Sequence, residues 1–318
     1  MALTTPTTEP AVIDIRTAPA QAAVVPSRTP LLGRLRCTRR KKVGTPRIVG
    51  ALIVIGIYVL AALAGPELLN YDPVATDTGN RLLPPMSTRD DGTIAFFGTD
   101  NLGRDILTLC VVGARTSLIV GVLVLLVSAV VGAAIGLVCG YFGGIVDTIF
   151  MRIADIQLAF PGILLAILFA AVLGPSLMNV VIVLSVGGWV TFARVVRAQT
   201  LATTQLDYVD ATRSLGAGHW HILRTAILPA CIPPMIVIAT LDIGSVILAE
   251  ASLSFLGVGA PGSFASWGNT ISLGRDFIAT AWWMSTIPGI CLSVLVVAFG
   301  VLGDAARDRF DPNLESQR

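Results

Sequence analysis

Charged side chains are scarce in this sequence. Asp, Glu, Lys and Arg make up 13% of its 318 residues, whereas hydrophobic residues make up 54%. A soluble domain ordinarily carries roughly 25% charged residues. The composition therefore excludes an ordinary soluble protein and indicates an integral membrane protein.

The sequence also lacks the residue clusters on which enzymes and metal proteins depend. Its only two histidines, His219 and His221, point to different sides of a helix at this spacing, and its five cysteines show no paired spacing. It contains no GxxxxGK[ST] loop for nucleotide phosphates and no HExxH sequence. We therefore expect no catalytic site, no metal site and no cofactor bound by this chain.

Long runs without charge are the main positive feature. A membrane-spanning helix needs about 20 apolar residues. The run 156–193 is long enough for two helices and is interrupted by Gly174-Pro175-Ser176. We predict an all-α polytopic membrane protein with six transmembrane helices. The expected ranges are 48–66, 117–139, 152–173, 179–198, 229–249 and 284–303.

The distribution of positive charge predicts the orientation. Many Lys and Arg residues lie between residues 28 and 47, directly before the first apolar run. The positive-inside rule therefore places the N-terminus in the cytoplasm, and six crossings return the C-terminus there. No small-residue cleavage pattern follows the first run, so we expect a retained anchor. The predicted parts are a largely disordered basic tail (1–46), the first span with an extracytoplasmic segment (47–116), a membrane core (117–303) with a cytoplasmic loop (199–228), and a cytoplasmic C-terminal tail (304–318).

One polar stretch, residues 207–230, interrupts the apolar sequence between the fourth and fifth spans. Tyr208, Ala211, Thr212 and Leu215 recur at helical spacing, which predicts a short helix with a mildly apolar face. Gly216-Ala217-Gly218 should end this helix before a second one that leads through Pro229 into the fifth span. Such an element can serve as a docking site for a soluble partner, or it can be an interfacial helix on the lipid headgroups.

This stretch resembles the EAA loop of ABC-transporter permeases, in which EAA is followed by a glycine and a closing Leu-Pro. Asp210-Ala211-Thr212 stands in place of EAA, Gly216 takes the glycine position, and Leu228-Pro229 closes the pattern. In that family the loop contacts the ATP-binding subunit. The resemblance therefore implies an ATPase-coupling site. Its members are Asp210, Ala211, Thr212, Gly216, Ala217, Leu228 and Pro229.

Further segments are similar to the C-type subunits of the dipeptide/oligopeptide/nickel permeases. "GTDNLGRDILTLCVVGARTSL" (98–118) resembles GTDxxGRDxxSRxxxGxRxSL, with Thr108-Leu109 replacing Ser-Arg; "GYFGGIVDTIFMRIADIQLAFP" (140–161), "EASLSFLGVGAPGSFASWG" (250–268) and "LGDAARDRFDP" (302–312) also match. We expect structural roles for eight residues of these segments. They are Asp100, Arg104, Asp105, Arg115, Asp147, Arg152, Asp155 and Pro161, with Arg152 and Asp155 as a possible ion pair.

The resemblance implies the type I ABC importer permease fold and a place in the plasma membrane of a prokaryote. It also implies a B-type permease partner, ABC ATPase subunits that carry ATP and Mg²⁺, and an extracytoplasmic solute-binding protein. The substrate would be a dipeptide or oligopeptide, or alternatively nickel or another small solute. No nucleic acid is expected as a partner.

Four residues are candidates for the pore or a gate. Asp242 is the one clear acidic residue deep in a predicted span, which makes it a functional candidate, although a hydrogen-bonded place inside the bundle is the simpler reading. Glu250, Phe255 and Gly257 lie where the fifth span reaches the outer side, in a segment that can also be a packing loop. An ion-coupled carrier or channel remains an alternative, but it would more naturally carry several such groups.

Overall fold

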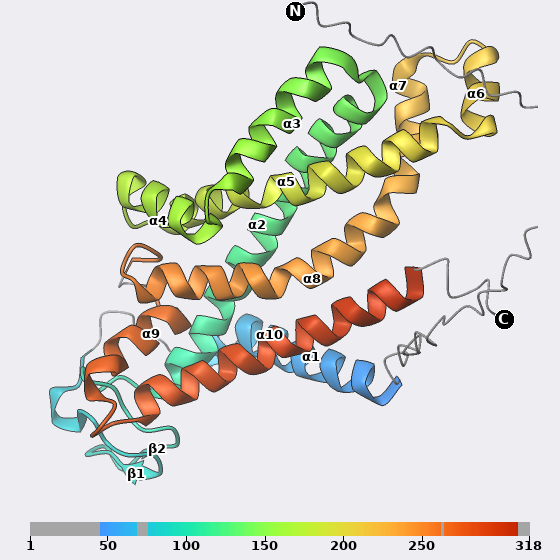
Figure 1. Ribbon diagram of the computed structural model, residues 1–318. Coiled ribbons are helices and arrows are strands. Elements are labelled where there is room, and N and C mark those ends of the chain that lie inside the picture. Colours follow the sequence, from blue (N-terminus) through green and yellow to red (C-terminus); the bar gives the residue numbers. More distant parts are fainter. Residues whose placement is uncertain (1–44, 69–75, 262–263, 311–318) are drawn as a thin grey trace, which may run out of the picture. The chain divides into compact units, whose positions relative to one another are not determined.

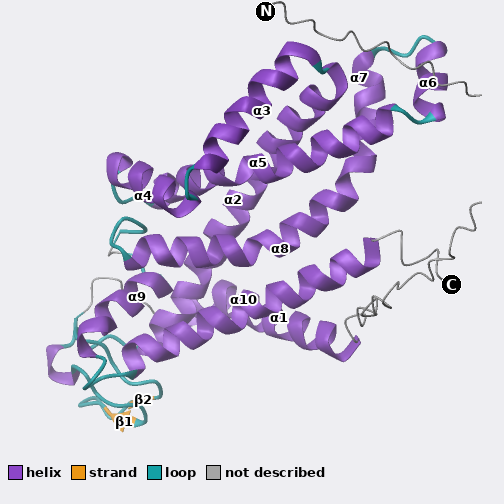
Figure 2. Cartoon of the chain, in the orientation of Figure 1, coloured by secondary structure: helices purple, strands orange, loops and turns teal. Residues whose placement is uncertain are grey.

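Helices dominate the computed structural model, which describes residues 45–68, 76–261 and 264–310 (Figures 1 and 2). The tail 1–46 therefore lies almost wholly outside the described residues. Five helices are long and apolar enough to cross a membrane, and a bent helix pair can supply a sixth span. The five are α1 (Thr45–Leu68), α2 (Ile106–Phe142), α5 (Leu177–Thr204), α8 (Leu228–Phe255) and α10 (Trp283–Phe310).

The bent pair, α3 (Gly144–Ala159) and α4 (Gly162–Leu173), replaces the single straight helix expected at 152–173. The two helices meet at 93°. The break lies at Phe160-Pro161, where Phe160 is extended (φ −94°, ψ 139°). Proline disfavours the helical conformation of the preceding residue and has no N–H for a helical hydrogen bond. The prediction of one uninterrupted third helix was therefore wrong, although six spans remain if the pair counts as one.

Several helices extend beyond the predicted spans, and α2 and α10 show the largest differences. Helix α2 begins at Ile106 rather than at residue 117, because the carboxylate of Asp105 caps it by accepting a hydrogen bond from the backbone N–H of Thr108 (2.8 Å). Helix α10 continues beyond residue 303 to Phe310, so the first charged residues of the expected tail are helical. Both boundaries were predicted at the point where the apolar run meets charged residues. The helix itself continues through those charged residues.

The most extensive helix packing is between α2 and α5. A Cβ added to Gly136 of α2 would lie 2.5 Å from the carbonyl oxygen of Ala193. Gly132 and Gly140, four residues to either side, face α5 in the same way. Small residues at this spacing allow two helix backbones to approach closely within a membrane. The glycines therefore let α2 and α5 pack backbone to backbone over several turns, and α8 packs on both helices.

The segment between α1 and α2 carries structure of its own. It contains the 3₁₀ turn η1 (Thr78–Asn80) and an antiparallel hairpin of β1 (Ser87–Thr88) and β2 (Ile94–Ala95). On the same side of the bundle, α9 (Trp267–Gly274) and η3 (Arg275–Phe277) connect α8 to α10. At the opposite end lie α6 (Asp207–Ser214) and α7 (His219–Ile222), together with the start of α1 and the end of α10 (Figure 1).

Candidate functional site: the projecting element 207–229

The predicted helix, glycine turn and second helix are all present in residues 207–229. Helix α6 ends in a Schellman motif: the N–H of Gly216 donates to Arg213 O (3.0 Å) and the N–H of Ala217 donates to Thr212 O (3.3 Å). Gly216 has φ +83°, a left-handed conformation that strains any residue with a Cβ. An added Cβ would nevertheless meet no atom within 4 Å. The glycine is therefore required by the backbone conformation and not by packing within this chain.

One side of the element is anchored in the bundle. Val209 of α6, Ile222 of α7 and Ile227 are all 0% exposed and share an apolar cluster with Val196 of α5 and Ala133 of α2. The connection to α8 is a π-helical turn, η2 (Leu223–Ile227). Such turns often occur at functional sites. The anchoring means that a force on α6 or α7 is transmitted to the membrane helices.

The other side of the element presents large apolar side chains to the exterior. Leu215 is 89% exposed and Trp220 is 75% exposed, and Tyr208 is about half exposed. The predicted apolar face of α6, which included Tyr208 and Leu215, is therefore not the face that packs on this chain, because Val209 fills that place. Trp220 is likewise exposed, whereas Leu223 and Ile227, which follow it in the chain, are buried.

The remaining predicted coupling residues surround these exposed side chains. Asp210 is exposed and forms an i,i+3 ion pair with Arg213 (3.4 Å), without capping the helix. Ala211 is also exposed, whereas Thr212 is partly buried and its hydroxyl donates to Tyr208 O (2.7 Å). Leu228 and Pro229 form the first turn of α8. The whole predicted set therefore lies in one continuous surface element.

A second group of predicted residues connects α3 to α5. Asp147 accepts two hydrogen bonds from the guanidinium of Arg197, one of them 2.6 Å long from Nη2, and Asp155 pairs with Arg194 (2.6 Å). The expected pairing of Asp155 with Arg152 was wrong: Arg152 is exposed and makes no ion pair within the described part of the chain. These contacts hold the bent pair against α5 on the side near the projecting element.

The residues of the segment 98–118 organise the hairpin end of the bundle. Asp100 is 1% exposed and accepts hydrogen bonds from the backbone N–H groups of Leu102 and Arg104 and from Arg104 Nε (2.7 Å). Asp105 pairs with Arg89 (3.0 Å) in addition to capping α2. Asp91, between β1 and β2, has its carboxyl pKa held below the usual value by hydrogen bonds from Thr93. The structural roles expected of Asp100, Arg104 and Asp105 thus have a physical basis.

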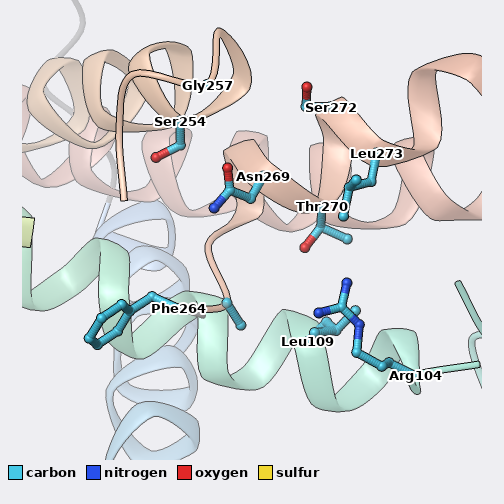
Figure 3. A pocket seen from close by; sticks show the side chains of 10 residues that line it. Arg104, Leu109, Ser254, Gly257, Phe264, Asn269, Thr270, Ser272 and Leu273 are labelled. Carbon is cyan, nitrogen blue, oxygen red and sulfur yellow. The ribbon is translucent and has the colours of Figure 1, made fainter. Parts of the chain in front are cut away.

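A small cavity of about 150 Å³ lies beside Arg104. Figure 3 shows the Arg104 guanidinium pointing toward Thr270 of α9, with Ser254 and Gly257 on the far side. Gly257 is exposed and has φ +79° in the turn after α8. The guanidinium carbon of Arg275 lies over the ring of Phe255, 6.0 Å from the ring centroid. These two candidates for the gate therefore lie at the hairpin end of the bundle, near the end of α8. Arg115 is exposed on α2 and forms no ion pair with any described residue.

The other two pore candidates occupy different environments on α8. Glu250 is 0% exposed, and its carboxylate accepts hydrogen bonds from the hydroxyls of Ser117 (2.9 Å) and Ser254 (2.8 Å). It therefore joins α8 to α2 inside the bundle. Asp242 is half-buried and lines a cavity between α4, α5 and α8. The simpler reading of Asp242, a hydrogen-bonded place in the bundle, does not hold among the described residues.

Sequence reasoning missed the partners of Asp147, Asp155 and Glu250. Arg194 and Arg197 lie inside the predicted span 179–198, where a charged side chain requires a partner. That signal could have indicated the α3–α5 ion pairs. Ser117 is separated from Glu250 by 133 positions, and nothing in the local sequence indicates that contact.

Together, these features describe a multi-pass membrane protein with an anchored element whose large apolar side chains, Leu215 and Trp220, remain exposed. Residues 132–316 match the family described as "Binding-protein-dependent transport system inner membrane component", and the chain belongs to this family.

Curated relatives are similar in sequence to this chain over most of its length. It is 38% identical over 264 residues to the dipeptide transport system permease protein of Haemophilus influenzae, covering 83% of this chain and 90% of that one. It is 37% identical over 269 residues to the di/tripeptide transport system permease protein of Pseudomonas aeruginosa, covering 84% and 88%. Among solved structures, an inward-facing methionine ABC transporter, MetNI, matches with a TM-score of 0.52 at 22% identity, covering 65% of this chain and 98% of that one. This last similarity concerns the fold alone.

Proposed function

We propose that this permease imports dipeptides or oligopeptides and that the projecting element 207–229 docks on an ATPase subunit. The observation that carries the docking proposal is the pair of exposed side chains Leu215 (89%) and Trp220 (75%) on an element whose opposite side is fixed in the bundle. Exposed aromatic and large apolar groups are common anchors of protein interfaces. The Asp210-Arg213 pair beside them offers polar contacts at the rim.

The proposed orientation follows from charge. The basic residues before α1 favour a cytoplasmic start of α1, in the plasma membrane of a prokaryote. The end of α10 and the projecting element share that end of the bundle, where an ATPase can reach them (Figure 1). The hairpin end then faces an extracytoplasmic solute-binding protein. ATP and Mg²⁺ are held by the ATPase subunits, and this chain performs no catalysis.

Peptides are proposed as substrates because the relatives described above are named as dipeptide and di/tripeptide permeases. A second, B-type permease would supply the other half of the translocation pathway. The apolar side chains that α4 leaves exposed, Leu164, Leu168 and Val172 among them, are available for a neighbouring helix or for lipid.

Transport would proceed by alternating access. Nucleotide binding draws the ATPase subunits together and moves the docked element. Because Val209, Ile222 and Ile227 are packed between α2 and α5, that movement is transmitted to the membrane helices. The chain supplies the two-state element, and the difference in nucleotide binding between the two states supplies the free energy that shifts their populations.

A tryptophan at Gly216 tests this function. Gly216→Trp should abolish peptide uptake, or lower it at least tenfold, while the binding protein still captures peptide. Gly174→Trp is the matched control, because Gly174 has φ +82° and equally open surroundings but lies in the turn after α4. Normal uptake by the Gly216 variant, with normal retention of the ATPase on purification, would contradict the proposal.

Purification of the assembled complex separates this function from an ion-coupled carrier or channel. A permease of the proposed kind should co-purify with a P-loop ATPase and require ATP for uptake into proteoliposomes. A carrier or channel would transport without either.

A further inference from the structure

A cavity of about 270 Å³ lies between α4, α5 and α8. Asp242, which lines it, is near the centre of α8 and about 20 Å along the helix from Pro229. The cavity is therefore remote from the projecting element. Its lining consists of Gly162, Ile163, Leu165, Ala166, Val183, Leu184, Gly187, Gly188, Thr191, Asp242, Ser245, Val246, Ala249 and Leu253.

Asp242 is the only ionisable residue in this lining. The other polar side chains are the hydroxyls of Thr191 and Ser245, which add hydrogen-bonding capacity but no charge. Within residues 45–68, 76–261 and 264–310, the Asp242 carboxylate takes part in no hydrogen bond and no ion pair. An ionisable group at this depth is costly to keep without a partner. A cationic group in the cavity would supply the partner that this carboxylate lacks among the described residues.

The size and shape of the lining restrict that cation. A volume of about 270 Å³ is just below the ~300–1,000 Å³ of ordinary ligand pockets. It admits one end of a peptide rather than a long chain. Gly162 of α4 and Gly187 of α5 leave open space in this lining, since a Cβ added to either would meet no atom within 4 Å, so a small group can enter beside them. A primary ammonium with three N–H donors suits a single carboxylate flanked by hydroxyls.

We propose that Asp242 binds the protonated amino terminus of the peptide as it crosses the membrane. The inference rests on the proposed function, because it names the part of the peptide that this site recognises. The apolar remainder of the cavity accepts side chains of different kinds without selecting among them. The charge on Asp242 thus gives specificity for a free amine, while the sequence of the peptide is left to the binding protein.

The first experiment measures ATP-driven uptake of radiolabelled alanyl-alanine by the complete complex in proteoliposomes, with saturating binding protein. Asp242→Asn should lower the uptake rate at least tenfold, since a hydrogen bond to a charged group is worth about that factor or more. Asp242→Glu should keep part of it. Asp276→Asn is the matched control, because Asp276 is exposed on the outer surface and pairs only with Arg275; it should transport at the wild-type rate.

The second experiment identifies the group that Asp242 recognises. Saturation-transfer NMR on the complex in nanodiscs, without binding protein, compares alanyl-alanine with its N-acetylated form, which has no ammonium. Wild-type protein should prefer the free amine at least tenfold, and Asp242→Asn should abolish that preference. Equal binding of the two peptides by wild-type protein would overturn the inference. So would loss of the second permease from the Asp242→Asn complex, since Asp242 would then pair with that subunit.

The two proposals fail in different ways. If the wild-type complex imports no peptide, the proposed function fails. If it imports peptide and Asp242→Asn imports at the same rate, only the assignment of Asp242 fails.

Discussion

The hydroxyl of Tyr141, in the last turn of α2, lies 2.8 Å from Nδ1 of His219, the first residue of α7. Their rings also meet edge to face, with centroids 5.6 Å apart. This contact joins the projecting element directly to the longest membrane helix, in addition to the apolar anchor at Val209 and Ile222. The element is therefore fixed to α2 as well as to α8, into which it continues.

Loss of the Tyr141 hydroxyl should weaken coupling without disturbing the fold. Tyr141→Phe keeps the ring contact and removes a hydrogen bond worth about 0.5–1.5 kcal/mol. We expect a two- to tenfold fall in peptide imported per ATP hydrolysed, measured in proteoliposomes. His219→Gln should have a similar effect, and the double variant should be no worse than either single variant. Strictly additive effects would show that the two side chains act independently.

Removal of one partner of the α3–α5 ion pair should destabilise the bundle. Arg197→Ala leaves the carboxylate of Asp147 without its two charge-assisted hydrogen bonds, at a cost of about 1–3 kcal/mol. Arg194→Ala should cost less than about 1 kcal/mol, because the Arg194–Asp155 pair is more exposed. Thermal unfolding of the purified complex in detergent provides the comparison. An equal effect of both substitutions would contradict this ranking.

Glu250 should be more important for stability than for transport specificity. Glu250→Ala removes the carboxylate that accepts hydrogen bonds from the buried hydroxyls of Ser117 and Ser254. Each hydroxyl left without a partner should lower the free energy of unfolding by about 1–3 kcal/mol. Glu250→Gln retains an acceptor and should be much milder. The midpoint of thermal unfolding should therefore fall strongly for Ala and slightly for Gln. A stable Ala variant with altered substrate preference would instead assign Glu250 to the pore.

The close approach of α2 and α5 should not tolerate a methyl group. Gly136→Ala would place a Cβ 2.5 Å from Ala193 O, and overpacking of this kind costs roughly 1–3 kcal/mol. Gly50→Ala is the control, since Gly50 is also helical but has nothing within 4 Å. It should be neutral or slightly stabilising. Equal unfolding temperatures for the two variants would show that the helices can move apart freely.

The sequence predicted the features that depend on local chemistry. The position of Gly216 followed from the helix that it ends, and the five long apolar helices followed from composition. The bend at Pro161 was harder to predict, because apolar residues continue on both sides of it. An apolar run shows that helices are present but not the angle at which two successive helices meet.

The features that depend on distant residues could not be predicted. The predicted apolar face of α6 included Tyr208 and Leu215, but the residue that packs on α2 and α5 is Val209, because helical spacing alone does not show which apolar residues face this chain and which remain exposed. The partners of Glu250 and Asp147 also required the folded arrangement. The environment of Asp242, a half-buried carboxylate in a cavity formed by three helices, has no counterpart in the local sequence.

The most direct test of the docking proposal is photocrosslinking from position 215. A photoreactive residue in place of Leu215 should form an adduct with the ATPase subunit in the assembled complex. The same residue in place of Met86, which is also exposed but lies at the hairpin end, should form none with the ATPase. If position 215 forms no ATPase adduct while the complex still imports peptide, the element 207–229 is not the coupling site.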